Sequence, residues 1–143
     1  MIMITSLFYG FKNSLDFFTK FCHDRLTVQI IEKWKIKELA LVLSEIADML
    51  RSGDNAEWAN VFAHFQNESM HIISKMEFDL DALRKLITNI KNCFLGTHAF
   101  TNLALWHENT EKRTKLNQSL AFIRARLLEI LKDMENRLSE NIH

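Results

Sequence analysis

Apolar residues recur along this chain at intervals of three and four, which is the spacing of one face of an α-helix. The pattern predicts five helices, over residues 6–22, 35–52, 55–73, 80–95 and 110–138. Residues 26–34 are also expected to be helical, although their β-branched side chains would suit a short strand. The sequence therefore predicts an all-α fold, a single-domain helical bundle of about five helices with a long C-terminal helix.

The sharpest break in the pattern falls at residues 50–58. Gly53 can adopt the left-handed conformation that closes a helix. Asp54 or Asn55 can then cap the next helix, and Glu57 stands where it could complete a capping box with Asp54. We expect a tight joint between two helices here.

The later joints are marked less sharply. Asp79 precedes an apolar periodic run and is expected to cap a helix that Gly96 ends. Residues 97–107 then form an expected irregular joint, held to the core by Phe100 and Trp106.

The last helix is expected to be the longest. Its apolar positions recur close to a heptad, at Leu116, Leu120, Ile123, Leu127, Ile130, Met134 and Leu138. A helix of this extent would be about 40 Å long. It should span the whole bundle or extend beyond it into a partner.

Composition supports this architecture and narrows the choice of partners. The chain has 143 residues, which suits one domain over 1–143, and it has no proline and only three glycines, which disfavours tightly turned sheets. Eighteen basic and eighteen acidic side chains balance, so nucleic acid is not the expected partner. The two cysteines, Cys22 and Cys93, are expected to be reduced and buried.

The apolar and aromatic N-terminal stretch needs separate consideration. Lys12, Asp16 and Lys20 interrupt it at regular intervals, which fits neither a signal peptide nor a spanning helix. The sequence therefore predicts a cytoplasmic protein that does not bind a membrane.

One histidine and glutamate pattern could indicate a metal site. His64, Glu68 and His71 share a face of the third expected helix, and Glu68-x-x-His71 has the spacing used in di-iron bundles. Such a site also requires a second Glu-x-x-His and two further glutamates on other helices that converge with the first, and one short motif is weak evidence for that arrangement, so a solvated helix face is the preferred interpretation. A metal-dependent enzyme is the least favoured alternative, and we expect no catalytic residues and no cofactor.

A local excess of acidic residues marks the middle of the chain, relieved only by Lys75. The candidate partner-binding residues for a basic protein are Glu68, His71, Glu77, Asp79 and Asp81. Opposed charge patches steer association, so we expect this segment to face a basic partner. Reversing the charge of Asp79 is expected to weaken such a complex while leaving the fold intact.

Residues 39–134 contain three sets of packing and joint motifs. They are Leu43-x-x-Ile46-Ala47-x-x-Leu50-Arg51-x-Gly53 followed by Glu57-Trp58-Ala59-x-x-Phe62, then Phe94-Leu95-Gly96-Thr97-x-x-Phe100-Thr101-Asn102-Leu103, then Leu116, Leu120 and Leu127 on a closing helix. Together they resemble a family of small, uncharacterised bacterial α-helical proteins. Members of that family are similar to immunity proteins of contact-dependent growth inhibition and other polymorphic toxin systems.

The resemblance implies a binding function without catalysis. An immunity protein binds the C-terminal domain of its cognate toxin, a nuclease being one candidate, and blocks the active site or the substrate path. Thr101-Asn102 departs from the family's usual Asn-Asp order, and residues 1–34 have no clear counterpart. The alternative is a homo-oligomeric helical scaffold or regulator, such as a homodimer, formed through the first and last expected helices.

Overall fold

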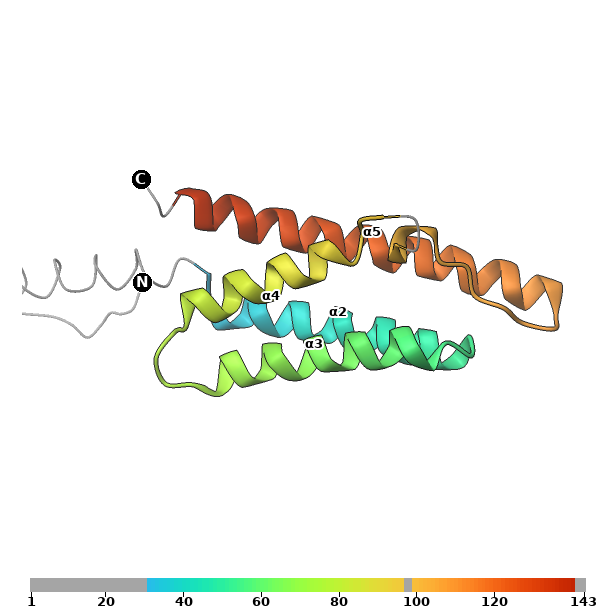
Figure 1. The fold of residues 1–143 in the computed structure, drawn as a ribbon, viewed down its shortest axis with the longest axis horizontal. Helices are drawn as coiled ribbons and strands as arrows, with labels where there is room; N and C mark the ends of the chain where they lie inside the picture. The colour runs from blue at the N-terminus through green and yellow to red at the C-terminus, as the bar shows by residue number, and fades with distance from the viewer. Residues whose placement is uncertain (1–30, 97–98, 141–143) are drawn as a thin grey trace, which may run out of the picture.

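The computed structural model describes residues 31–96 and 99–140, and these residues fold as a helical bundle. They form α2 (Lys33–Ser52), α3 (Ala56–Ser74), α4 (Leu80–Asn92), the 3-10 turn η1 (Phe100–Asn102) and α5 (Thr110–Glu140). Consecutive α-helices run in opposite directions (Figure 1). The all-α character and the long C-terminal helix are confirmed within these residues, with four α-helices. The helix expected over 6–22, and residues 26–30, lie outside the described residues.

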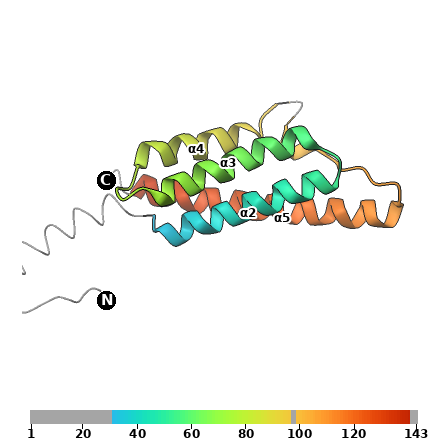
Figure 2. The same cartoon turned by 90° about the horizontal axis from the view of Figure 1, so that it is seen from below.

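α2 makes the two most extensive helix–helix contacts in the bundle, with α3 and with α5. The 31 residues of α5 correspond to about 46 Å of helix. Both views show the first turns of α5 running past the joint between α2 and α3 (Figures 1 and 2). The last helix therefore spans the bundle and overhangs it at one end.

The core is built from the apolar face of each helix and one aromatic cluster. On α2 the buried residues follow the predicted spacing: Ile36, Leu39, Ala40, Val42, Leu43, Ile46, Ala47 and Leu50. Phe62 of α3 and Phe100 of η1 are fully buried, with ring centres 4.5 Å apart. Trp58 and Phe94 pack on Phe100 at 5.5 and 5.6 Å between ring centres. The aromatic cluster therefore attaches the segment after α4 to α3.

The joint between α2 and α3 differs from the sequence prediction by one residue. Gly53 has a φ of −90°, and the left-handed residue is Asp54, with a φ of 58°. The N–H of Asn55 donates to the carbonyl of Leu50 at 2.8 Å, and that of Asp54 donates to Arg51 at 3.2 Å. This pair of hydrogen bonds is a Schellman motif with Asp54 in the left-handed position. The prediction that Gly53 takes that conformation is wrong.

Gly53 is instead required by a close approach of another segment. A Cβ atom built on Gly53 would lie 2.8 Å from Cδ2 and 2.9 Å from Cβ of Leu105. Leu105 is buried and belongs to the segment between η1 and α5. The glycine therefore allows this segment to pack directly on the α2–α3 joint.

An Asx side chain caps each of the three later α-helices. Asn55, Asp79 and Asn109 each accept a hydrogen bond from the backbone N–H three residues further on, at 3.0 to 3.1 Å. The prediction for Asp79 is confirmed. The cap of α3 is Asn55, so the capping box suggested between Asp54 and Glu57 is wrong.

The end of α4 also differs in detail from the prediction. The helix ends at Asn92, and the N–H groups of Phe94 and Leu95 donate to carbonyls three residues earlier, at 3.0 and 3.2 Å. Gly96 follows with a φ of 92°, in the left-handed region. Gly96 therefore redirects the chain after the helix has ended rather than ending it.

Candidate partner-binding site

The structure brings the predicted partner-binding residues to one end of the bundle. Glu68 and His71 lie in the second half of α3, Glu77 and Asp79 lie in the α3–α4 loop, and Asp81 lies in the first turn of α4. This loop is at the left of Figure 1, opposite the overhang of α5. We refer to residues 68–81 as the acidic end.

Asp79 has a structural role within the acidic end. Its Oδ1 accepts the N–H of Ala82 at 3.0 Å, and its Oδ2 accepts from Nζ of Lys75 at 3.0 Å. These two bonds, the backbone bond above all, hold the pKa of the Asp79 carboxyl below its ordinary value. A lysine at this position would remove the cap of α4. Contrary to the expectation from sequence, Asp79 is therefore unsuited to a charge-reversal test of binding.

Glu68 and His71 lie on the solvent side of α3. Oε1 of Glu68 is 3.3 Å from Nε2 of His64, one turn earlier, and the His64 side chain is 70% exposed. His71 is exposed. Among residues 31–96 and 99–140, no group of three or more His, Cys, Asp or Glu side chains is placed to hold a metal ion. The exposure of His64 and His71 is that of a solvated helix face.

Within the acidic end, Glu77 and Asp81 differ from Glu68 and Asp79 because no cation in the described chain is paired with them. Both are exposed, and neither takes part in the ion pairs formed within residues 31–96 and 99–140. Met76 precedes Glu77, and its side chain is 95% exposed. An apolar side chain beside two unpaired carboxylates has the composition of a binding anchor with a charged rim.

The opposite end of the bundle contains a connector, residues 99–109, that α5 holds by hydrogen bonds. The Asn117 side chain accepts the N–H of Leu105 at 2.7 Å and donates to its carbonyl at 2.9 Å. The same side-chain amide donates to the carbonyl of Arg113 at 2.9 Å. Asn117 therefore satisfies both backbone groups of Leu105, the residue that packs on Gly53.

Two arginines of α5 complete the attachment of the connector. Arg124 donates to the carbonyls of Phe100 and Leu103 at 3.0 and 3.2 Å, and its partial burial lowers the pKa of its guanidinium. Arg113 donates to the carbonyl of His107 at 3.0 Å. Sequence reasoning missed both roles, because arginine spacing on an amphipathic helix does not reveal which carbonyls lie nearby.

Trp106 does not hold the connector in the way that the sequence suggested. Phe100 is fully buried, as predicted, but Trp106 is 61% exposed. The Arg113 guanidinium lies 3.7 Å from the centre of the Trp106 ring, which is a cation–π contact. The prediction that Trp106 packs into the core is wrong, because a side chain of α5 covers one face of its ring on the surface instead.

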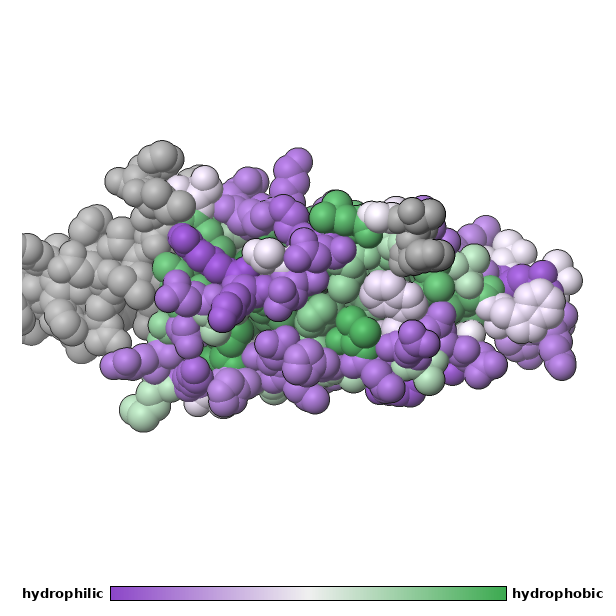
Figure 3. Space-filling view, in the orientation of Figure 1, coloured by the Kyte–Doolittle hydropathy of each residue, from purple (hydrophilic) through white to green (hydrophobic). Residues whose placement is uncertain are grey.

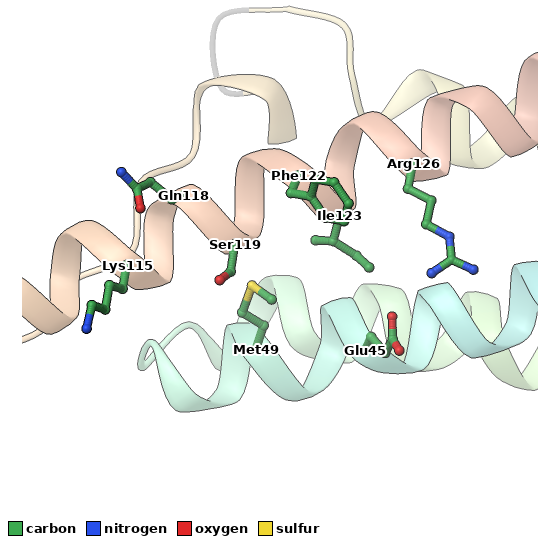
Figure 4. A pocket seen from close by; sticks show the side chains of 8 residues that line it. All are labelled: Glu45, Met49, Lys115, Gln118, Ser119, Phe122, Ile123 and Arg126. Atoms are coloured by element: carbon green, nitrogen blue, oxygen red, sulfur yellow. The ribbon is translucent and has the colours of Figure 1, made fainter.

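A groove between α2 and α5 is a second candidate surface. Its volume is about 540 Å³, and it is lined by Glu45, Met49, Lys115, Gln118, Ser119, Phe122, Ile123 and Arg126. Figure 4 shows Glu45 and Met49 on α2 facing the α5 side chains, with Lys115 and Arg126 at opposite ends. Phe122 is 73% exposed. Sequence reasoning missed this groove because Phe122 falls outside the apolar stripe of α5.

On the face shown in Figure 3, hydrophilic residues predominate and the apolar surface forms small, separate patches. No α-helix among residues 31–96 and 99–140 is both long enough and apolar enough to cross a membrane.

The structure thus defines an all-α helical bundle with two surfaces suited to protein contacts. No protein-family model, characterised protein or solved structure is detectably similar to the chain.

Proposed function

We propose that this protein is a cytoplasmic immunity protein of a contact-dependent growth inhibition or related toxin system. It binds the C-terminal domain of its cognate toxin and neutralises it by covering the active site or the substrate path. The resemblance of residues 39–134 supports this proposal. Its motif residues include Leu43, Leu50, Phe62 and Phe100, which are all fully buried. The likeness therefore concerns the scaffold, and the surface that selects a partner must use other residues.

The acidic end supplies the observation that carries the proposal. Met76 exposes almost its whole side chain, although burying a methionine from water is worth about 1.5–3 kcal/mol. Glu77 beside it and Asp81 in the next turn expose carboxylates that lack a cation within the described residues. In a complex, Met76 would enter an apolar pocket of the toxin domain, and the two carboxylates would meet basic side chains around that pocket.

Inhibition by occlusion needs no reactive group on this chain. A toxin that cleaves nucleic acid concentrates positive charge where it binds phosphates. Unpaired carboxylates are attracted to such a site, even though the chain as a whole carries no net charge. A nuclease domain is therefore the toxin class that the acidic end would suit best.

The proposal is tested by co-expression with the C-terminal region of the adjacent upstream open reading frame. We expect that region to stop growth when it is expressed alone. This protein should restore growth and should co-elute with the region. A catalytically inactive form of the region is the matched control, because it separates binding from toxicity and should co-elute equally well.

Two results would overturn the proposal. The first is a C-terminal region that is harmless when it is well expressed alone. The second is growth rescue without a complex, which would mean that protection does not come from binding.

A further inference from the structure

Phe122 is an aromatic side chain that the bundle leaves largely in solvent. It lies near the middle of α5, at the groove between α2 and α5, and 73% of its surface is exposed. Beside it, Met49 of α2 and Ile123 of α5 add apolar surface to the groove (Figure 4). A large apolar side chain next to an apolar groove is typical of a protein contact.

The charges around Phe122 are arranged symmetrically along α5. Lys115 lies seven residues before Phe122, and Glu129 lies seven residues after it. Seven residues are close to two turns, so all three side chains project from nearly the same side of the helix. All three are exposed.

Neither flanking charge is strongly engaged within the described chain. Glu129 forms none of the ion pairs within residues 31–96 and 99–140. Lys115 approaches Glu111 at 3.7 Å, but both side chains are at least 75% exposed. Such an exposed ion pair contributes little to the stability of the fold, so Lys115 remains available to another acidic group.

We infer that the α2–α5 groove and Phe122 form the interface of a homodimer with two-fold symmetry. In this dimer the two α5 helices cross in opposite directions at Phe122. Lys115 of each copy then faces Glu129 of the other, and each Phe122 packs against the groove of the other copy. A two-fold interface requires a surface that is complementary to itself, and the sequence of this stripe has that property.

The same charges argue against a partner of one dominant sign. Glu45 lines the groove together with Lys115 and Arg126, so the groove has both acidic and basic groups around its apolar residues. A strongly basic or acidic partner would face like charges at some of these positions. The inference does not rest on the proposed function, because the acidic end lies at the α3–α4 loop rather than in this groove.

The test is the mass of the full chain in solution, measured by sedimentation equilibrium over a wide range of concentration. We expect the wild-type protein to approach the dimer mass as concentration rises. Phe122→Glu should raise the dissociation constant at least about a hundredfold, because it places two carboxylates at the centre of the interface. Leu95→Glu is the matched control. Leu95 is also 69% exposed, but it lies in the turn after α4, so this variant should dimerise normally.

A charge exchange tests the orientation of the two helices. Lys115→Glu alone should raise the dissociation constant about tenfold, because both symmetric pairs become repulsive. The double variant Lys115→Glu/Glu129→Lys should restore wild-type affinity. Circular dichroism should show the same helix content in every variant.

Three results would overturn the inference. They are a monomer at every concentration, a Phe122→Glu variant that still dimerises normally, and a charge exchange that fails to restore the dimer.

Discussion

At one end of the bundle the backbone polar groups are hydrogen-bonded within the fold, and at the other end apolar and charged side chains are left exposed. At the connector end, the backbone groups of Leu105 are bonded to Asn117, and the carbonyls of Phe100 and Leu103 accept from Arg124. At the acidic end, Met76 is 95% exposed, and Glu77 and Asp81 form no ion pair within the described residues.

This difference separates a structural joint from an available surface. Polar groups that are satisfied inside the fold gain little from a partner, whereas an exposed apolar side chain beside free carboxylates gains contacts on binding. Substitutions at the connector end should therefore change stability, and substitutions of Met76, Glu77 or Asp81 at the acidic end should change binding.

The largest effect on stability should come from the aromatic residue of the connector. Phe100→Ala removes a fully buried ring that packs on Phe62 and Trp58, so it should lower the free energy of unfolding by about 3–5 kcal/mol. At the acidic end, Met76→Ala should change it by less than about 0.5 kcal/mol. Urea denaturation of both variants measures the contrast, and equal losses would refute the division between the two ends.

The contact between Gly53 and Leu105 should show strong coupling. Gly53→Ala places a Cβ within 2.9 Å of Leu105 and should cost about 1–3 kcal/mol. Leu105→Ala, itself destabilising by about 2–5 kcal/mol, removes the two Cδ atoms that this Cβ would meet but keeps the Leu105 Cβ, 2.9 Å away. A double-mutant cycle should show that Gly53→Ala costs less in the Leu105→Ala background than in wild type, because only the contact with the Cβ of residue 105 remains. Simple additivity would mean that the close approach is not what requires glycine.

The amide of Asn117 provides the next test of the connector. Asn117→Ala leaves the buried residue Leu105 without partners for its N–H and carbonyl, which should cost about 1–3 kcal/mol. Gln118→Ala is the control at the adjacent position, where the side chain is exposed. Thermal melts of both proteins compare them, and an Asn117→Ala variant as stable as the control would contradict the role assigned to this amide.

The smallest effect should be a pH dependence at Asp79. Its carboxyl has a lowered pKa in the folded protein, so its charge stabilises the fold above the ordinary value of 3.8. That contribution is lost as pH falls through the lower folded value. Asp79→Asn retains an oxygen that can cap α4 but removes the charge. The variant should be less stable than wild type at neutral pH, and the difference should disappear in strong acid. A difference that is constant with pH would contradict this account.

The helices were predictable because their apolar spacing is a local property of the sequence. The extent of α5 and the cap at Asp79 follow from residues within a few turns of each other. The left-handed residue at the α2–α3 joint was placed one position too early, because the reason for Gly53 is Leu105, fifty-two residues later. Local rules could not identify that contact.

The candidate surfaces were predictable only in part. The acidic end followed from the charge pattern, but its key apolar residue, Met76, carries no sequence signal that distinguishes it from a core methionine. Asn117 and Phe122 were missed because their partners lie on other segments or, for Phe122, on a second copy as we infer. Periodicity identifies which face of a helix is apolar, and it does not show what covers an exposed residue.

The central claim is that the acidic end binds the toxin domain, and a matched pair of charge reversals tests it most directly. Glu77→Lys/Asp81→Lys changes one loop residue and the second residue of α4. Glu57→Lys/Glu108→Lys makes the same change in charge at the second residue of α3 and in the connector, at the opposite end. Each double variant therefore replaces one acidic residue near a helix N-terminus, so the expected loss of helix stability is the same in both.

The measurement is the affinity of each variant for the inactive toxin domain by isothermal titration calorimetry. We expect Glu77→Lys/Asp81→Lys to bind at least about tenfold more weakly than wild type, and the opposite-end variant to bind within about twofold of it. Equal affinities for the two variants would show that the acidic end is not the binding surface.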